Sequence, residues 1–273
     1  MNTQEFFATH PVFTVQEFDR YLADSGSDSR FTRNRLLGYY RATNRLISVR
    51  NGLYAVVGAG MEAATAPVDS YLIASALRPD SLLAYHTALE LHGYAHSLYS
   101  ERQILTHHPM SATFNFRNLR YRTVQPSAAL TDTDALSYGV VTISRDNIGI
   151  RVTSLERTLV DCLDRMRLAG GWEEMWRSFE SVPYLDLYLT IHYALLLQNA
   201  TTIAALGYYL ELQRENWMVS DDYLQRLMSH RPAHKHYLDR SRRHGGKLVS
   251  RWNLVVPQDI FYRTWEEPDE SYA

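Results

Sequence analysis

The chain of 273 residues contains a single cysteine and very few lysines, and both shortages limit what it can be. One cysteine cannot form an intramolecular disulfide, and it cannot supply the paired ligands of a cysteine-based zinc finger. Cys162 lies in the apolar stretch LVDCLD, where we expect a buried thiol that packs as a small hydrophobic group. The lysines are Lys235 and Lys247, so an active site that needs a lysine has these two candidates.

Long hydrophobic runs are also missing. No apolar segment approaches the ~18 residues of a membrane span, and the N-terminal sequence MNTQEFFATHPVF lacks the basic flank and apolar centre of a signal peptide. We therefore expect a cytoplasmic protein with no membrane partner. A hydrophobic content of 45% and an aromatic content of 12% predict a folded chain with a real core.

Motifs of nucleotide-binding enzymes and hydrolases are absent from the sequence. The chain has no P-loop G-x-x-x-x-G-K-[ST], no Rossmann G-x-G-x-x-G and no G-x-S-x-G nucleophile elbow. His230, His234, His236 and His244 are clustered, but Pro232 interrupts the first pair and no HExxH is present. The sequence therefore predicts no cofactor, no metal site and no enzymatic activity.

Positive charge is concentrated in residues 29–57, SRFTRNRLLGYYRATNRLISVRNGLYAVV. No Asp or Glu lies between the first and the last arginine of this stretch. The formal net charge of the whole chain is only -2, so the basic stretch is a local feature. Such a patch is typical of a contact with nucleic acid, and a solvated charged face is the alternative.

Two helices are expected in and before this stretch. Thr14 and Glu17 have the S/T-x-x-E spacing of a capping box and predict a helix over residues 15–24. A turn at residues 25–28 separates it from a second helix, which is expected to begin near Thr32.

The second helix is expected to be amphipathic. Its apolar face would carry Leu36, Leu37 and Tyr40. Its opposite face would carry Asn34, Arg35, Gly38 and Tyr39, with Arg33 and Arg41 on the flanks. Glycine inside a helix costs about 1 kcal/mol relative to alanine. A close approach of the backbone to DNA would explain Gly38, and so would tight packing.

A β-hairpin is expected directly after the second helix. Residues 46–49 and 53–57 are rich in β-forming side chains and flank Arg50-Asn51-Gly52, and Asn-Gly is a strong signal for a tight hairpin. A helix followed by a short hairpin is the order of parts in a winged helix-turn-helix. The sequence therefore predicts that the helix enters a major groove while the hairpin reaches nearby phosphates.

The residues expected to contact DNA are Arg30, Thr32, Arg33, Asn34, Arg35, Tyr39, Arg41, Arg45, Arg50 and Asn51. Arg35 is the candidate for a bidentate contact to guanine, and Asn34 can pair with adenine. The arginines that follow Tyr39 are expected to contact phosphates, which supplies affinity without sequence information. An error of one residue in helical phase would exchange the base-reading roles with Arg33.

The remainder of the chain predicts a larger α+β domain. Small residues dominate residues 58–67, so we expect a winged helix over residues 1–60, a linker over 61–66 and a second domain over 67–273. Helices are expected over residues 68–77, over 81–92 with Gly93 as the C-cap, between Trp172 and Gln213, and over 221–228. Strands are expected between about 103 and 152 and over 249–257, before an acidic tail of Glu266, Glu267, Asp269 and Glu270. Runs of strands and runs of helices, without alternation of the two, indicate an α+β fold.

Polar residues interrupt one apolar helix of this second domain. Thr153 and Glu156 have the spacing of a second capping box. Asp161 and Asp164 could share a face as a catalytic pair, but Arg157 and Asp161 form an i,i+4 ion pair, and structural roles are favoured. A nuclease would also need a lysine after an acidic pair, and neither lysine has that context.

Two further features concern histidine and the C-terminal basic residues. His192 lies among leucines and tyrosines and is expected to pack in the core. A second basic cluster consists of Arg240, Arg242, Arg243, Lys247 and Arg251. A solvated surface, an additional DNA contact, and a site for an acidic or RNA-bearing partner are all open interpretations of it.

Four groups of segments occur in a characteristic order: RLISVRNGLYAV, then DSYLIASALRPDSLLAYHTALELHG, then VTSLERTLVDCLDR with LAGGWEE, and finally RWNLVVP. Together they resemble the AbiEi family of antitoxins from type IV toxin-antitoxin and phage abortive-infection systems of bacteria. The resemblance spans nearly the whole chain, and its specificity lies in the collinear set because no single segment is a catalytic fingerprint.

The resemblance implies a transcriptional repressor with two parts. An N-terminal winged helix would bind inverted repeats in double-stranded DNA upstream of the operon, and a C-terminal domain would neutralise a nucleotidyltransferase-like toxin, AbiEii. The alternatives are a winged-helix regulator with an effector-binding C-terminal domain and, less favoured, a nucleic-acid-directed hydrolase. The oligomeric state is open, because two winged helices could pair only on the DNA.

Overall fold

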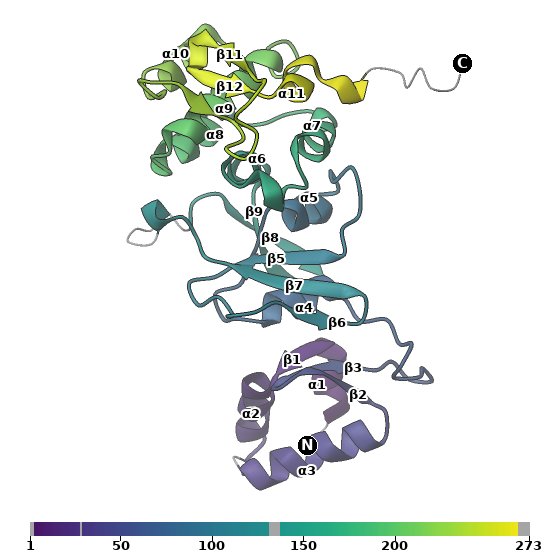
Figure 1. The fold of residues 1–273 in the computed structure, drawn as a ribbon. Helices are drawn as coiled ribbons and strands as arrows, with labels where there is room; N and C mark the ends of the chain where they lie inside the picture. Colours follow the sequence, from purple (N-terminus) through teal and green to yellow (C-terminus); the bar gives the residue numbers. More distant parts are fainter. Residues whose placement is uncertain (1–2, 28, 131–136, 267–273) are drawn as a thin grey trace, which may run out of the picture. The chain divides into compact units, whose positions relative to one another are not determined.

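Figure 1 shows the computed structural model of the chain, which has a mixed α+β fold. The structure describes residues 3–27, 29–130 and 137–266. The chain divides into two compact units. The first consists of Met1–Leu83, Ser100–Thr123 and Thr142–Arg151, and the second of Ala84–Tyr99, Val124–Val141 and Val152–Ala273. The linker expected at 61–66 falls inside the first unit, so the domain boundary stays a prediction. Of the acidic tail, Glu267, Asp269 and Glu270 lie outside the described residues.

The N-terminal part of the first unit is a region of short helices and strands (Figure 1). Its elements are α1 (Thr3–Thr9), β1 (Val12–Thr14), α2 (Val15–Asp24), α3 (Arg30–Ala42), β2 (Leu46–Arg50) and β3 (Leu53–Val56). The strands form an antiparallel sheet in the order β1-β3-β2, and the predicted hairpin is therefore confirmed.

Side-chain caps fix where α2 and α3 begin. The capping box is confirmed: Glu17 N donates to Thr14 Oγ1 at 3.2 Å, and Thr14 N donates to Glu17 Oε2 at 2.6 Å. The start of α3 near Thr32 was wrong by two residues, because the Ser29 hydroxyl accepts the Thr32 amide and the helix begins at Arg30.

An aromatic core holds these elements together. Its buried residues are Phe6, Phe7, Phe13, Phe18, Leu22, Leu37 and Leu46. Leu36 and Tyr40 are partly buried and pack against this core, which confirms the predicted apolar face of α3. The opposite face of α3 is consequently held outward by the packing of the whole region.

The rest of the first unit is built on a sheet and one helix. Residues 57–69 contain neither helix nor strand, and α4 (Ser70–Ala76) follows. A six-stranded sheet has the order β6-β7-β5-β4-β9-β8. Its strands are β4 (Leu82–Leu83), β5 (Glu101–Leu105), β6 (Phe114–Phe116), β7 (Leu119–Val124), β8 (Val140–Arg145) and β9 (Ile148–Thr153). Strands β5 to β9 confirm the predicted β region, whereas β4 was not predicted as a strand.

The helix expected over residues 81–92 is shorter than predicted. Leu82 and Leu83 instead pair with β5 as β4. Tyr85 then adopts a φ of 56°, which breaks any helix, so α5 (His86–His92) begins only after it. Gly93 at φ 79° ends α5 as the predicted left-handed cap.

The second unit is mainly helical. Beside α5 it contains α6 (Leu155–Asp164), α7 (Trp172–Glu180), α8 (Leu187–Leu196), α9 (Ala200–Leu212), α10 (Asp221–Met228) and α11 (Gln258–Tyr262). Short 3-10 helices cover Ala128–Leu130, Met166–Leu168, Ser250–Trp252 and Thr264–Glu266. Within the described ranges, no helix has the length and apolar character that crossing a bilayer requires.

A small sheet of the second unit corrects the strand expected over residues 249–257. Its strands are β10 (His236–Tyr237), β11 (Lys247–Val249) and β12 (Leu254–Val256), in the order β10-β12-β11. The 3-10 turn before Asn253, which has a φ of 49°, divides the expected strand into the antiparallel pair β11 and β12. Trp252 in this turn packs against Gly207 of α9.

Candidate nucleic-acid interface

The outward face of α3 is polar, basic and largely uncommitted. Asn34, Arg35, Gly38, Tyr39 and Arg41 are all exposed. Among the residues that the structure describes, Arg35 and Arg41 have no hydrogen-bond or ion-pair partner. Both guanidinium groups are therefore free to meet an external anion without first breaking an internal contact.

Arg33 differs from these arginines because it is used inside the fold. Its Nη1 lies 2.8 Å from Asp19 Oδ2 of α2, and its Nε donates to Asn34 Oδ1 at 3.1 Å. The Arg33 side chain is only 16% exposed. The helical phase therefore directs Arg35 outward and Arg33 toward α2.

At the start of α3, one residue takes part in the helix cap and others are exposed. Arg30 is exposed in the first turn. The amide of Thr32 is used by the Ser29 cap, and its side chain is half-buried. Phe31 is 75% exposed, although the sequence analysis did not single it out. In the sequence, Phe31 stands four residues before Arg35, and this helical spacing could have predicted that both lie on the outward face.

The basic residues around the hairpin are more engaged than expected. Arg45 is half-buried, with its guanidinium carbon 5.7 Å from the centre of the Tyr40 ring. The Arg50 guanidinium contacts Met110 Sδ and lies 5.2 Å from the centre of the Phe114 ring. The expected phosphate contact of Arg50 would compete with this packing inside the first unit. Asn51 is exposed in the turn.

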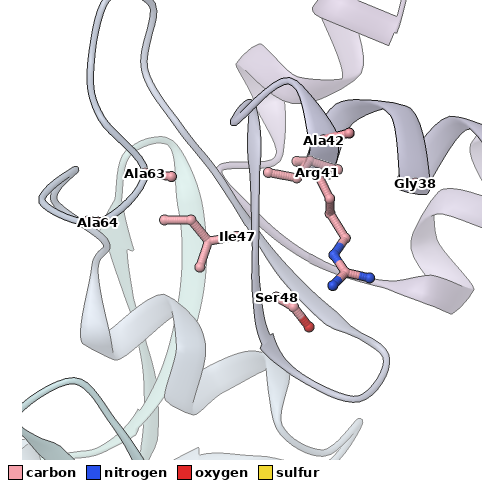
Figure 2. A pocket seen from close by; sticks show the side chains of 8 residues that line it. Gly38, Arg41, Ala42, Ile47, Ser48, Ala63 and Ala64 are labelled. Carbon is pink, nitrogen blue, oxygen red and sulfur yellow. The ribbon is translucent and has the colours of Figure 1, made fainter.

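A groove of about 600 Å³ runs beside the C-terminal half of α3. It is lined by Gly38, Arg41, Ala42, Leu46, Ile47, Ser48, Ala63 and Ala64. Figure 2 shows Arg41 extending from α3 toward Ser48 of β2. A hydroxyl and a guanidinium beside one groove are suitable donors for a phosphate oxygen.

The space around Gly38 tests whether packing requires a glycine in α3. A Cβ built at Gly38 would have no heavy atom within 4 Å, apart from its chain neighbours and the helix backbone. Tight packing inside the described chain therefore does not require this glycine. Of the two explanations for Gly38, a close approach of the helix backbone to DNA therefore remains.

The acidic pair considered for catalysis is taken up in structural contacts of the second unit. Asp161 Oδ2 lies 3.2 Å from Arg157 Nε, and Tyr193 Oη donates to Asp161 Oδ1 at 2.6 Å. Asp164 Oδ1 accepts hydrogen bonds from the side chains of Asn199 and Thr202. The predicted ion pair is thus confirmed, and it is buried.

The second capping box was wrong in its residues. Ser154 is the N-cap of α6, and its hydroxyl accepts the Arg157 amide at 3.4 Å. Glu156 is not part of the cap, since its Oε1 accepts the Asp186 amide at 3.3 Å. The box spacing fails because the helix begins one residue later than the pattern implies.

The remaining sequence candidates give no assembled site. Cys162 is buried, and burial together with the nearby Asp161 charge raises the pKa of its thiol. His192 was expected in the core but is half-buried, with ring centres 5.1 Å from Tyr138 and 6.1 Å from Tyr188. In the described ranges, no three His, Cys, Asp or Glu side chains group closely enough to hold a metal ion.

Most of the second basic cluster is engaged by neighbours in the second unit. Arg242 pairs with Asp259, and Arg251 Nη1 lies 2.6 Å from Glu211 Oε1. The Lys247 ammonium lies 4.1 Å from the centre of the Tyr262 ring. Arg240 and Arg243 are exposed. These contacts reduce the positive charge that the cluster presents to a partner.

A buried histidine network in the second unit was missed by the sequence analysis. His86 is fully buried, its Nε2 lies 3.0 Å from Glu174 Oε1, and its ring stacks on Tyr99 at 3.7 Å. Glu174 also accepts hydrogen bonds from the amide and the hydroxyl of Ser97. His86 Nδ1 also lies 3.3 Å from Glu90 Oε1 at i,i+4 spacing, which is a local pair. Glu174 is 88 residues from His86, so no local pattern identifies that contact.

Comparisons with known proteins give a likeness of fold. The chain is similar to the crystal structure of the RV2827C protein from Mycobacterium tuberculosis, with a TM-score of 0.61 and 15% sequence identity. The match covers 96% of this chain and 93% of that chain. No family model matches the sequence, and no curated protein matches it. At this identity the likeness establishes a shared whole-chain fold.

Proposed function

We propose that the chain is a DNA-binding antitoxin of the AbiEi type, which represses its own toxin-antitoxin operon and counteracts a nucleotidyltransferase-like toxin. Residues 1–60 are the winged helix-turn-helix that binds inverted repeats in the operator. Residues 67–273 form the antitoxin domain. The protein acts in the bacterial cytoplasm and needs no cofactor.

The order of elements in the N-terminal region supports the repressor half. Helices α2 and α3 are followed by the β2–β3 hairpin, and β1 completes a three-stranded sheet against β3. This order of elements is typical of a winged helix-turn-helix, in which the second helix of the motif enters the major groove. By this correspondence, α3 is the recognition helix.

The single observation that carries the proposal is the uncommitted basic face of α3. Arg35 and Arg41 are exposed and have no partner among the described residues, and no acidic residue occurs between Arg30 and Arg50. Free guanidinium groups without nearby carboxylates attract phosphates over the distance of a Debye length. Arg35 then contacts guanine, and Arg41 contacts the backbone beside the groove.

The antitoxin half rests on the sequence resemblance to AbiEi. The fold shared with the RV2827C protein extends over both units, which is compatible with a common plan for the whole chain. The structure of the second unit suggests no separate catalytic role for Asp161 and Asp164, because both carboxylates are engaged by neighbouring side chains.

A gel-shift experiment on the upstream DNA of the gene tests the repressor half. The full chain is compared with a variant that carries both Arg35→Ala and Arg41→Ala, in the presence of Mg²⁺. We expect the parent to give a saturable, salt-sensitive shift of intact DNA and the variant to give none. An absent shift in the parent would contradict the repressor, and cleavage of the probe would favour the hydrolase.

Co-expression with the neighbouring toxin gene tests the antitoxin half. We expect the full chain to restore growth, and we expect the double variant to restore it as well, because the two substituted side chains are exposed and are proposed to serve DNA binding only. If the parent represses the operon but does not restore growth, the chain is a winged-helix regulator whose C-terminal domain has another ligand.

A further inference from the structure

Phe31 is placed unlike the other phenylalanines of the N-terminal region. Phe6, Phe7, Phe13 and Phe18 are at most 4% exposed and form the aromatic core, whereas Phe31 is 75% exposed. It packs in no ring pair and in no core cluster of the described residues. Tyr39 on the same helix is 60% exposed, so two large aromatic side chains stand on the surface of one basic helix. Exposed apolar groups that cluster among polar residues are typical of a surface that contacts a partner.

The neighbours of Phe31 on the helix surface identify that partner's chemistry. Phe31, Arg35 and Tyr39 follow each other at intervals of four residues, so they form one stripe along α3. The middle of this stripe is the arginine proposed to read guanine. In a helix-turn-helix, residues near the N-terminus of the recognition helix reach the base edges, and Phe31 lies in the first turn.

The apolar group that a major groove offers to such a side chain is the C5-methyl of thymine. An α-helix rises about 1.5 Å per residue, so four residues span about 6 Å. Successive base pairs are about 3.4 Å apart, and 6 Å therefore corresponds to roughly two base-pair steps. A helix that lies along the groove would place the phenylalanine and arginine contacts about two base pairs apart.

We propose that Phe31 is a specificity-determining residue, which recognises the methyl group of a thymine about two base pairs from the guanine read by Arg35. The inference rests on the proposed DNA-binding function and adds a defined element of the operator to it. A second copy of this chain is the competing occupant of Phe31, and the experiment separates the two.

The test uses a series of operators, in each of which one thymine of the operator is replaced by uracil. This replacement deletes only the methyl group. We expect one position per half-site to weaken binding by the parent about fourfold, the factor that corresponds to the ~0.8 kcal/mol of one buried methylene. Phe31→Ala should bind thymine and uracil operators equally at that position. Phe31→Leu should keep part of the discrimination, because leucine still offers an apolar contact.

A second substitution series measures the spacing. Guanine is replaced by 7-deazaguanine, which removes the N7 acceptor that a bidentate arginine uses. We expect the sensitive guanine to lie about two base pairs from the sensitive thymine, and we expect Arg35→Ala to remove the guanine sensitivity while it keeps the thymine sensitivity. Thermal melting of each variant shows that the fold is retained, since both side chains are exposed.

The outcomes distinguish this inference from the function on which it rests. The parent could bind the operator specifically while Phe31→Ala loses as much affinity as the parent when thymine is replaced by uracil. That result would overturn the role of Phe31 and leave the proposed repressor function intact. If Phe31→Ala instead abolishes self-association and keeps the thymine preference, Phe31 faces a second copy. If the parent shows no sequence-specific binding, the proposed function and the inference both fail.

Discussion

Arg33 Nη1 lies 2.8 Å from Asp19 Oδ2, and this ion pair joins α3 to α2. A pair of this kind, with Asp19 44% exposed, stabilises a fold by no more than about 1 kcal/mol. Its larger consequence is for orientation, because the pair turns Arg33 toward α2 while Arg35 projects outward. Two arginines only two residues apart therefore have different environments.

The structural role of Arg33 and the proposed base-reading role of Arg35 can be separated by mutation. We expect Arg35→Ala to lower operator affinity by about 1–3 kcal/mol and to relax base preference at one position, with an unchanged melting temperature. We expect Arg33→Ala to lower the melting temperature slightly and to keep the base preference. Binding titrations against operators with single base changes, together with thermal melts, measure both effects.

Arg35→Lys is the control for charge. It keeps the attraction to phosphates but loses the bidentate geometry, so it should retain nonspecific affinity and lose the base preference. If Arg33→Ala rather than Arg35→Ala relaxes the base preference, the outward face of α3 is not the face that reads DNA.

Gly38→Ala is expected to change stability and DNA binding in opposite directions. The position is helical and a Cβ there has open space, so alanine should stabilise the helix by up to about 1 kcal/mol. If the helix backbone approaches DNA closely at Gly38, the added methyl group would stand in the way, and the affinity for all operators should fall. Urea unfolding and DNA titration of the same protein provide the two measurements.

Gly207→Ala is a matched glycine control in α9. There the added Cβ would lie 2.2 Å from the Trp252 ring, so we expect a clear loss of stability instead of a gain. A Gly38→Ala variant that is more stable and binds DNA as tightly as the parent would show that no backbone approach occurs at this position.

Local patterns in the sequence predicted the N-terminal region well. The capping box at Thr14 and the Asn-Gly turn at Asn51 are short-range signals whose partners lie within a few residues, and the structure confirms both. The apolar period of α3 also identified Leu37 as a core residue. The engagement of Arg50 was not predictable, because its contacts Met110 and Phe114 are distant in sequence, with Met110 60 residues further along the chain.

Long-range pairing explains two of the other errors. Leu82 and Leu83 have the apolar spacing of a helix, but they are the strand partners of Leu105 and Ile104. The buried contact of His86 with Glu174 likewise joins residues 88 positions apart. Periodicity reports which face of a segment is apolar, and it does not report which distant segment will cover that face.

Arg41 and Arg50 should differ in their effect on the salt dependence of DNA binding. Each phosphate contact contributes about 0.9 to the slope of log affinity against log salt concentration. We expect Arg41→Ala to lower that slope by about one phosphate contact, because Arg41 has no internal partner in the described structure. We expect Arg50→Ala to leave the slope unchanged and to lower stability through the lost contact with Phe114. If Arg41→Ala and the parent have the same slope of log affinity against log salt concentration, Arg41 does not contact a phosphate.

The second unit should lose stability in acid through Glu174. Burial alone would raise the pKa of this carboxyl group, but hydrogen bonds from the Ser97 side chain, His86 and the Ser97 amide outweigh burial and hold the pKa below its ordinary value of 4.5. A carboxylate with a lowered pKa in the folded state stabilises the fold fully above its unfolded pKa. That contribution is lost as the pH falls through the lower folded pKa. Ser178 and Tyr99 also face this carboxylate, and neither hydroxyl ionises in that pH range.

Glu174→Gln tests this dependence by removing the titrating group and keeping its shape. We expect the variant to be less stable than the parent at pH 7, where Glu174 is ionised, and the difference to shrink as the pH falls below about 4.5. Urea unfolding between neutral pH and the acid limit of solubility measures the free energy of unfolding at each pH. Glu173→Gln is the matched control, because Glu173 is 54% exposed and its pair with Arg177 is a surface pair. If the two variants follow the parent in parallel, the network around His86 does not determine the acid sensitivity of this unit.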